Sequence, residues 1–154
     1  MRSRAYVETS IPSFYFETRP EAEMVARRGW TREWWARASD TGRVGYESGR
    51  RRRTGEGGLS VAAGLPALAI ESAVLEIVAV YIRHQVMPAD PAGDALHLAL
   101  ASYHRCDFLV TWNCKHLANA NKFGHIRRVN SLLGLLSPSL VTPLEMLGGN
   151  DDQG

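Results

Sequence analysis

Glu8, Asp94 and Asn113 are the residues of this sequence whose types and positions best suit chemistry. Glu8 directly follows a short β-prone run, and Asn113 directly follows an apolar run that could form a buried strand. Ligands of open α/β sheets gather at the carboxyl ends of the strands. Asp94 begins an apolar segment, where an ionised carboxylate is costly unless a metal, a hydrogen bond or a counter-charge compensates for it. We therefore expect the three side chains to lie where strands and helices meet one edge of a sheet.

Mg²⁺ is the cation that such a group of side chains would suit. Hard divalent cations bind oxygen ligands, usually one or two carboxylates with several retained waters. Clustered carboxylates repel each other, so a cation would allow them to stay ionised together. A metal held there could activate water and stabilise the transition state of a phosphodiester cleavage. The alternative for Glu8 is structural, because the helix dipole favours an acid in the first turn of a helix.

A second set of side chains could instead bind zinc. It consists of five possible nitrogen or sulfur ligands in a short span: His97, His104, Cys106, Cys114 and His116. Zinc could use four of them, but no CxxC or HExxH spacing is present. Since His97 stands one turn after Asp94, we favour a His97 that hydrogen-bonds within the core or orients that carboxylate.

The order of the expected elements predicts an α/β fold with a mostly parallel sheet that helices cover on both faces. The expected strands are residues 5–7, 65–70 and 108–112, a turn and strand over 123–129, and a final strand over 140–143. The expected helices are one capped by Thr9 or Ser10, one over 21–38, one that Ser72 caps and that runs through Tyr81, one that Asp90 caps and Pro91 opens, and one that Asn130 caps and that runs through Leu136.

The helix expected over residues 21–38 is rich in tryptophan and arginine. Trp30 and Trp34 stand four residues apart, so they share one face of the helix. Two interpretations stay open: the aromatic side chains pack inward with the arginines outward, or the helix offers a basic, aromatic surface to RNA or a partner helix.

Composition fits one globular domain, residues 1–148, followed by a loose tail over 149–154. The chain has 154 residues, and its net charge of +2 is too small to indicate nucleic-acid binding alone. Cys106 and Cys114 are not in a CxxC pair, which suits a reducing cytosol. No apolar run has the length of a membrane span, and the N-terminus has no signal-peptide core, so we expect a cytoplasmic protein without membrane contact.

Three separated segments resemble one known family. They are YVETSIPSFY, GDALHLALAS and FLVTWNCKHLAN, and they occur in the family's order. The chain resembles the PIN domain, in the branch of VapC-type toxins of toxin–antitoxin systems, over residues 4–40 and 65–148. The resemblance implies a three-layer α/β/α fold and a Mg²⁺- or Mn²⁺-dependent ribonuclease. It also implies an RNA substrate, a cognate antitoxin protein as partner and a possible homodimer.

The resemblance assigns the site residues as well. Glu8 falls where the family has its first acid, which is usually Asp, and Asp94 falls on the acid of a later helix. Asn113 falls where many members have Asp, and His116 lies in the same loop. The implied catalytic residues are thus Glu8, Asp94 and Asn113, with Glu8 and Asp94 as metal ligands. Asparagine can supply a carbonyl ligand but no charge, so we expect a reduced metal affinity.

Residues 41–64 depart from the family, which has a further acid in a helix at this place. The segment is rich in glycine, contains the run Arg50-Arg51-Arg52-Arg53 and has neither helical nor strand periodicity. One way of encoding GYESGRRRRTGEGGLS gives VTSPAVVDELARAGY when a single base is dropped, which restores an Asp-Glu-Leu of the family pattern. We therefore hypothesise a compensated pair of frameshifts over residues 42–63. A catalytically inactive PIN remnant that binds RNA or a protein is the alternative function.

Overall fold

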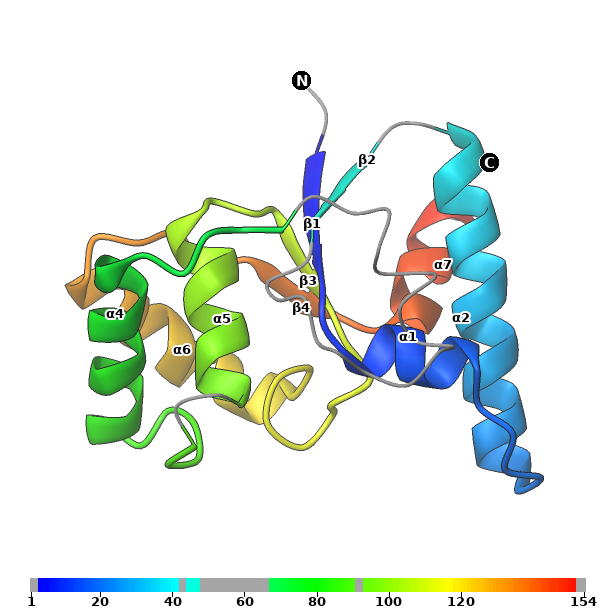
Figure 1. Ribbon diagram of the computed structural model, residues 1–154, viewed down its shortest axis with the longest axis horizontal. Helices are drawn as coiled ribbons and strands as arrows, with labels where there is room; N and C mark the ends of the chain where they lie inside the picture. The colour runs from blue at the N-terminus through cyan, green and yellow to red at the C-terminus, as the bar shows by residue number, and fades with distance from the viewer. Residues whose placement is uncertain (1–2, 42–43, 48–66, 91–92, 152–154) are drawn as a thin grey trace.

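A parallel four-stranded sheet forms the centre of the protein, in the order β2-β1-β3-β4 (Figure 1). The computed structural model describes residues 3–41, 44–47, 67–90 and 93–151. The strands are β1 (Ser3–Val7), β2 (Val44–Glu47), β3 (Phe108–Val110) and β4 (Ser139–Val141), and every neighbouring pair runs parallel. The expected α/β fold with a parallel sheet is confirmed.

Helices cover both faces of the sheet, which gives three layers (Figure 1). One side carries α4 (Ser72–Arg83), α5 (Asp94–Tyr103) and α6 (Ala120–Leu132), and the other carries α1 (Ser10–Tyr15), α2 (Ala22–Thr41) and α7 (Pro143–Asp151). Within the described parts of the chain, no helix has the length and apolarity that crossing a membrane requires.

The strands supply apolar side chains to both helical layers, because successive residues of a strand point to opposite faces. In β1, Tyr6 packs in the core beneath α4, α5 and α6, whereas Ala5 and Val7 pack in the core beneath α1, α2 and α7. Leu109 and Val110 of β3 divide between the two cores in the same way. A sheet buried on both faces explains why residues 5–7 and 108–110 are apolar runs without polar alternation.

The strand order places a change of direction between β1 and β3. The chain passes from β1 outward to β2, then returns to β3 beside β1, and continues outward on the other side to β4. Connections that leave neighbouring strands in opposite directions open a crevice at the strands' carboxyl ends, where α/β proteins commonly bind ligands. Glu8 and Thr111 are the first residues beyond β1 and β3, so both lie at this crevice.

Helix α5 begins at Asp94, and its buried body over residues 95–102 confirms the expected apolar helix. Its N-cap is Gly93 and not Asp90, so the predicted cap was wrong. The backbone carbonyl of Asp90 accepts the Gly93 N–H in a turn that precedes the helix, at 3.1 Å. A Cβ at Gly93 would lie 2.9 Å from Oδ2 of the Asp90 side chain, which would have to move to make room for it. Pro91 lies outside the described residues.

The predicted strand over 123–129 is wrong, because these residues belong to α6. Ile126 and Val129 are buried three residues apart, which is a helical spacing. Asn130 caps no helix. It lies buried inside α6 and bonds Tyr81 Oη through Oδ1 at 2.5 Å and Ser102 Oγ through Nδ2 at 3.1 Å. The actual N-cap is Asn119, whose side chain accepts the Asn121 N–H.

Several further expectations need correction or fall outside the described residues. Strand β2 lies inside the segment expected to be irregular, where it pairs with β1, and residues 67–70 form no strand. Helix α4 has Glu71 rather than Ser72 as its N-cap. The last strand ends at Val141, and α7 continues through Asp151 in place of the expected tail. The arginine run 50–53 lies outside the described residues.

The tryptophans of α2 pack inward. Trp34 is buried, and Trp30 stacks on Trp112 with ring centroids 6.1 Å apart. The indole N–H of Trp112 donates to Thr31 Oγ1 at 2.7 Å, and the Arg27 guanidinium lies over the Trp112 ring. This packing fixes the segment after β3 against α2, so the aromatic face serves the core.

Candidate active site at the carboxyl edge of the sheet

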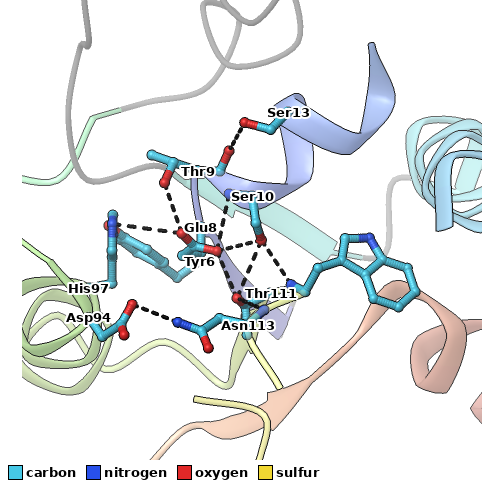
Figure 2. Close-up of polar contacts among 10 residues, drawn as sticks. Tyr6, Glu8, Thr9, Ser10, Ser13, Asp94, His97, Thr111 and Asn113 are labelled. Atoms are coloured by element: carbon cyan, nitrogen blue, oxygen red, sulfur yellow. Dashed lines mark hydrogen bonds and ion pairs between the residues drawn. The ribbon is translucent and has the colours of Figure 1, made fainter. Parts of the chain in front are cut away.

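Glu8 is a buried carboxylate that receives hydrogen bonds from four donors (Figure 2). Its Oε1 accepts the Thr9 hydroxyl at 2.8 Å. Its Oε2 accepts the Ser10 backbone N–H at 3.1 Å, the Ser10 hydroxyl at 2.5 Å and the Thr111 hydroxyl at 2.7 Å. Since the first residues of α1 and the end of β3 both donate to it, Glu8 joins the two strands on either side of the crevice.

Backbone bonds hold the same junction in register. The Glu8 N–H donates to Val110 O at 3.0 Å, which extends the β1–β3 pairing by one residue. The Trp112 N–H donates to Ser10 Oγ at 2.8 Å, and the Asn113 N–H donates to Thr111 Oγ1 at 2.9 Å. The path of the chain after β3 is therefore fixed by short polar side chains, and it carries Asn113 into the crevice.

Asn113 meets Asp94 across the crevice (Figure 2). Its amide Nδ2 donates to Asp94 Oδ1 at 2.9 Å. Its carbonyl Oδ1 already accepts the backbone N–H groups of Lys115 and His116, at 3.2 and 3.0 Å. The amide therefore presents hydrogen-bond donors to Asp94, and its oxygen is committed to the turn that follows.

His97 connects α5 to β1. Its Nδ1 lies 2.7 Å from Tyr6 Oη, and its Nε2 lies 3.9 Å from Glu8 Oε1, inside a region where all three side chains are buried. Asp94 and His97 stand one helical turn apart on α5, and Figure 2 shows both side chains pointing toward the end of β1. The expected hydrogen bonding of His97 within the core is confirmed.

The surroundings of Glu8 favour its ionised form. Burial raises the pKa of Glu8, but the Coulombic attraction of His97 and the hydrogen bonds from Ser10, Thr111 and Thr9 lower it by more. The net pKa therefore lies below the ordinary value for glutamate. An anionic Glu8 at neutral pH is the form that could bind a cation.

Glu8→Gln is expected to weaken the acid sensitivity of folding. Because the pKa of Glu8 is lower in the folded chain, the unfolded chain binds more protons, so stability rises with pH in this range. The contribution of Glu8 is complete above its ordinary pKa of 4.5 and is lost as the pH falls through the lower folded pKa. Urea unfolding is measured at several pH values from neutral pH down into this window. The free energy of unfolding should fall less steeply with decreasing pH for Glu8→Gln than for the exposed-site control Glu33→Gln. Equal pH dependences for the two variants would contradict the prediction.

The crevice offers the small number of carboxylates with which proteins usually bind Mg²⁺. Two carboxylates, Glu8 and Asp94, converge there, and Mg²⁺ usually binds one or two carboxylates and several waters. Asn113 does not offer its carbonyl oxygen in this conformation, contrary to the expectation that it could serve as a ligand. Among the described residues there is no group of three or more His, Cys, Asp or Glu side chains arranged to hold a metal.

The side chains considered for zinc have different surroundings in the structure and do not form one site among the described residues. Cys106 is buried in the core with the apolar side chains, whereas Cys114 is exposed. His104 Nε2 lies 2.9 Å from the Ala69 carbonyl oxygen, and His116 reaches Asn113 through its backbone N–H. The structure gives no zinc-binding group for these side chains within the described residues.

Lys122 is a neighbour of the site that the sequence did not reveal. Burial lowers the pKa of Lys122, and the negative charge of Asp94 acts in the opposite direction. Lys122 belongs to the first turn of α6. Because a turn and strand were expected over 123–129, the predicted elements place Lys122 in a loop before them. Ser10 and Thr111 were also missed, because short hydroxyl side chains at strand ends have no distinctive spacing.

Comparison of the chain with protein-family models, with curated proteins and with solved structures finds no match.

Proposed function

We propose that this protein is a Mg²⁺- or Mn²⁺-dependent endoribonuclease of the VapC type, built on a PIN-like domain. The observation that supports it is the convergence of Glu8, Asp94 and Asn113, from three separate segments, at the crevice between β1 and β3. These are the residues that the resemblance to the PIN domain assigns to the site. An RNA substrate, a cognate antitoxin and a cytoplasmic location belong to the same proposal.

The side chains divide the work of such a site between binding and positioning. Glu8 and Asp94 would hold the cation, which when bound activates water and stabilises charge on the phosphodiester. Asn113 fixes the orientation of Asp94 through its amide N–H. The four donors around Glu8 hold its carboxylate in one orientation. Because three of them bond Oε2, Oε1 is the oxygen that would bind the cation.

An inactive PIN remnant that binds RNA or a protein is the second candidate, and one observation favours it. Asn113 replaces an acid of the family pattern and satisfies Asp94 Oδ1 with an uncharged amide. A carboxylate that is already hydrogen-bonded needs a cation less, and one negative charge fewer weakens the attraction for Mg²⁺.

An RNA-cleavage assay distinguishes the two candidates. The purified chain is incubated with structured and unstructured RNAs in Mg²⁺ or Mn²⁺, and in a chelator. The enzyme is expected to cleave only with the metal, and the Asp94→Ala variant, purified in parallel, controls for contaminating nuclease. RNA binding without cleavage in either protein would support the remnant. Cleavage that persists in the chelator would contradict both.

A further inference from the structure

Strand β4 forms an open edge of the sheet. It is the last strand in the order β2-β1-β3-β4, and among the described residues it pairs only with β3. The Ser139 N–H donates to Asp107 O at 2.9 Å, and Val141 O accepts a bond of 2.9 Å from the segment after β3. Because successive residues of a strand direct their backbone groups to alternate sides, the N–H and C=O of Leu140 point away from β3. Neither group has a hydrogen bond among the described residues.

A hollow of 230 Å³ lies along this edge, and we call it the β4 groove. Figure 1 shows α6 and α7 on either side of β4. The groove is lined by residues 137–141 from the strand, by Phe123, Ile126 and Arg127 from α6, and by Glu145 from α7. It is smaller than the about 300–1,000 Å³ of typical small-molecule sites, so it suits a side chain of a polypeptide better than a free ligand.

The backbone groups of Leu140 indicate which kind of molecule fits the β4 groove. Leu140 is only 5 % exposed, and backbone polar groups that are covered in this way cost free energy when they stay unpaired. One N–H and one C=O on the same edge match the backbone of an extended peptide, which offers an acceptor and a donor at the spacing of a strand. Successive side chains of such a peptide would point alternately toward α6 and toward α7.

The two walls of the groove restrict the sequence of the peptide. Phe123 and Ile126 make the α6 wall apolar, and Arg127 adds a cation to it. Arg127 is exposed and has no ion pair or hydrogen bond among the described residues. On the α7 wall, Glu145 Oε1 accepts the N–H and the hydroxyl of Thr142, at 3.1 and 3.2 Å. No cation of the described chain pairs with Glu145, so each wall carries a charge that a partner can complement.

We propose that the β4 groove is a docking site for an extended segment of a partner protein, which adds to the sheet beside β4. The segment carries an apolar and an acidic side chain toward α6, and a basic side chain toward α7. Proteins protect open edges with short strands and charged side chains. The three residues of β4 and the two rim charges therefore disfavour unspecific pairing but accept a segment with complementary charges.

The groove is separate from the crevice of the proposed ribonuclease. Its lining does not include Glu8, Asp94 or Asn113. Docking at β4 therefore goes beyond the proposed function and does not depend on it. Asp94→Ala, which should abolish cleavage, should bind the docked segment as the wild type does.

Peptide selection and a charge exchange test the docking site. Random linear peptides displayed on phage are selected on the purified full chain, and a selected peptide is labelled for fluorescence anisotropy. We expect the selected peptides to share the alternating pattern of side chains. Arg127→Glu should raise the dissociation constant at least ~10-fold, because it sets like charges together. A peptide with lysine in place of its glutamate should restore the affinity for this variant.

Arg128→Glu is the matched control for the charge exchange. It makes the same change at the next residue of α6, an exposed arginine that does not line the groove. The dissociation constant should stay within about twofold of the wild-type value, as expected for a surface charge away from the contact. Circular dichroism checks that each variant is folded.

Hydrogen exchange tests the backbone pairing directly. In the free chain the Leu140 amide should exchange faster than the Ser139 amide, which is bonded to Asp107 O. Saturation with the peptide should slow exchange at Leu140 at least ~10-fold and leave Ser139 unchanged. A peptide that is N-methylated at the paired residue should bind more weakly, because it cannot donate to the Leu140 carbonyl.

Several results would overturn the proposal. They are the absence of any enriched peptide, binding that Arg127→Glu does not weaken, and a bound peptide that leaves exchange at Leu140 unchanged. Self-association of the chain that Arg127→Glu abolishes would assign the groove to a second copy and would also overturn it.

Discussion

Asp94→Ala is expected to lower metal-dependent RNA cleavage on the order of a thousandfold, as loss of a group that stabilises transition-state charge commonly does. Asp94 is the carboxylate at the start of α5, and the partner that the structure gives it is the amide of Asn113. Among the described residues, removing it would leave Glu8 as the only carboxylate at the crevice that could bind the proposed cation. The measurement is kcat/KM on a fluorescent RNA at saturating Mg²⁺.

Folding should survive this substitution, so the loss can be assigned to chemistry. The Asp94 side chain is only partly buried, and no side-chain bond of Asp94 caps α5, whose N-cap is Gly93. Glu33→Gln is the matched control, because Glu33 is an exposed acid of α2 in a surface pair with Arg37, and such pairs contribute little. Cleavage by Asp94→Ala at the wild-type rate would exclude the crevice as the active site.

The convergence of Glu8, Asp94 and Asn113 could be predicted because each stands where an apolar run meets a polar residue. Parallel strands buried on both faces produce such runs, and the carboxyl ends of neighbouring strands meet at one edge. The sequence therefore predicted the α/β fold and the place of the side chains. It did not predict which atoms meet: Asn113 presents its Nδ2 because two backbone N–H groups occupy its Oδ1.

Helix α6 was missed because its buried polar residue imitates a cap. Asparagine before an apolar run is a common start of a helix, and Asn130 precedes such a run. In the structure Asn130 is buried inside α6, where Tyr81, Ser102 and Ser137 satisfy its side chain. Tyr81 and Ser102 are far from Asn130 in sequence, so these two contacts are visible only after folding. The misplaced helix start also concealed that Lys122 lies in the first turn of α6.

Strand β2 was missed for a different reason. Val44–Glu47 is only four residues long and has glycine at its second position, so its local preference for a strand is weak. Pairing with all but the last residue of β1 provides what the local sequence lacks. The rest of the segment that departs from the family pattern lies outside the described residues. The hypothesis of frameshifts over 42–63 therefore stays a prediction, which nucleotide sequencing of the gene would test.

Asn113→Asp is expected to make the stability of the protein depend on Mg²⁺. The carboxylate introduced at position 113 would still accept the Lys115 and His116 N–H groups, so the turn after β3 is preserved. It would lose the donor to Asp94 and set two negative charges side by side. Without metal we expect a loss of about 1–3 kcal/mol in the free energy of unfolding.

Mg²⁺ should reverse this loss, because a ligand that binds only the folded state adds about 2.7 kcal/mol at a hundred times its dissociation constant. Urea unfolding with and without millimolar Mg²⁺ measures the difference. Asn121→Asp, which adds the same charge at an exposed position early in α6, should show no such dependence. An increase in Mg²⁺-dependent RNA cleavage would accompany the gain in affinity. If Mg²⁺ stabilises Asn113→Asp no more than the wild type, the crevice does not bind a cation, and the remnant becomes the better account of the chain.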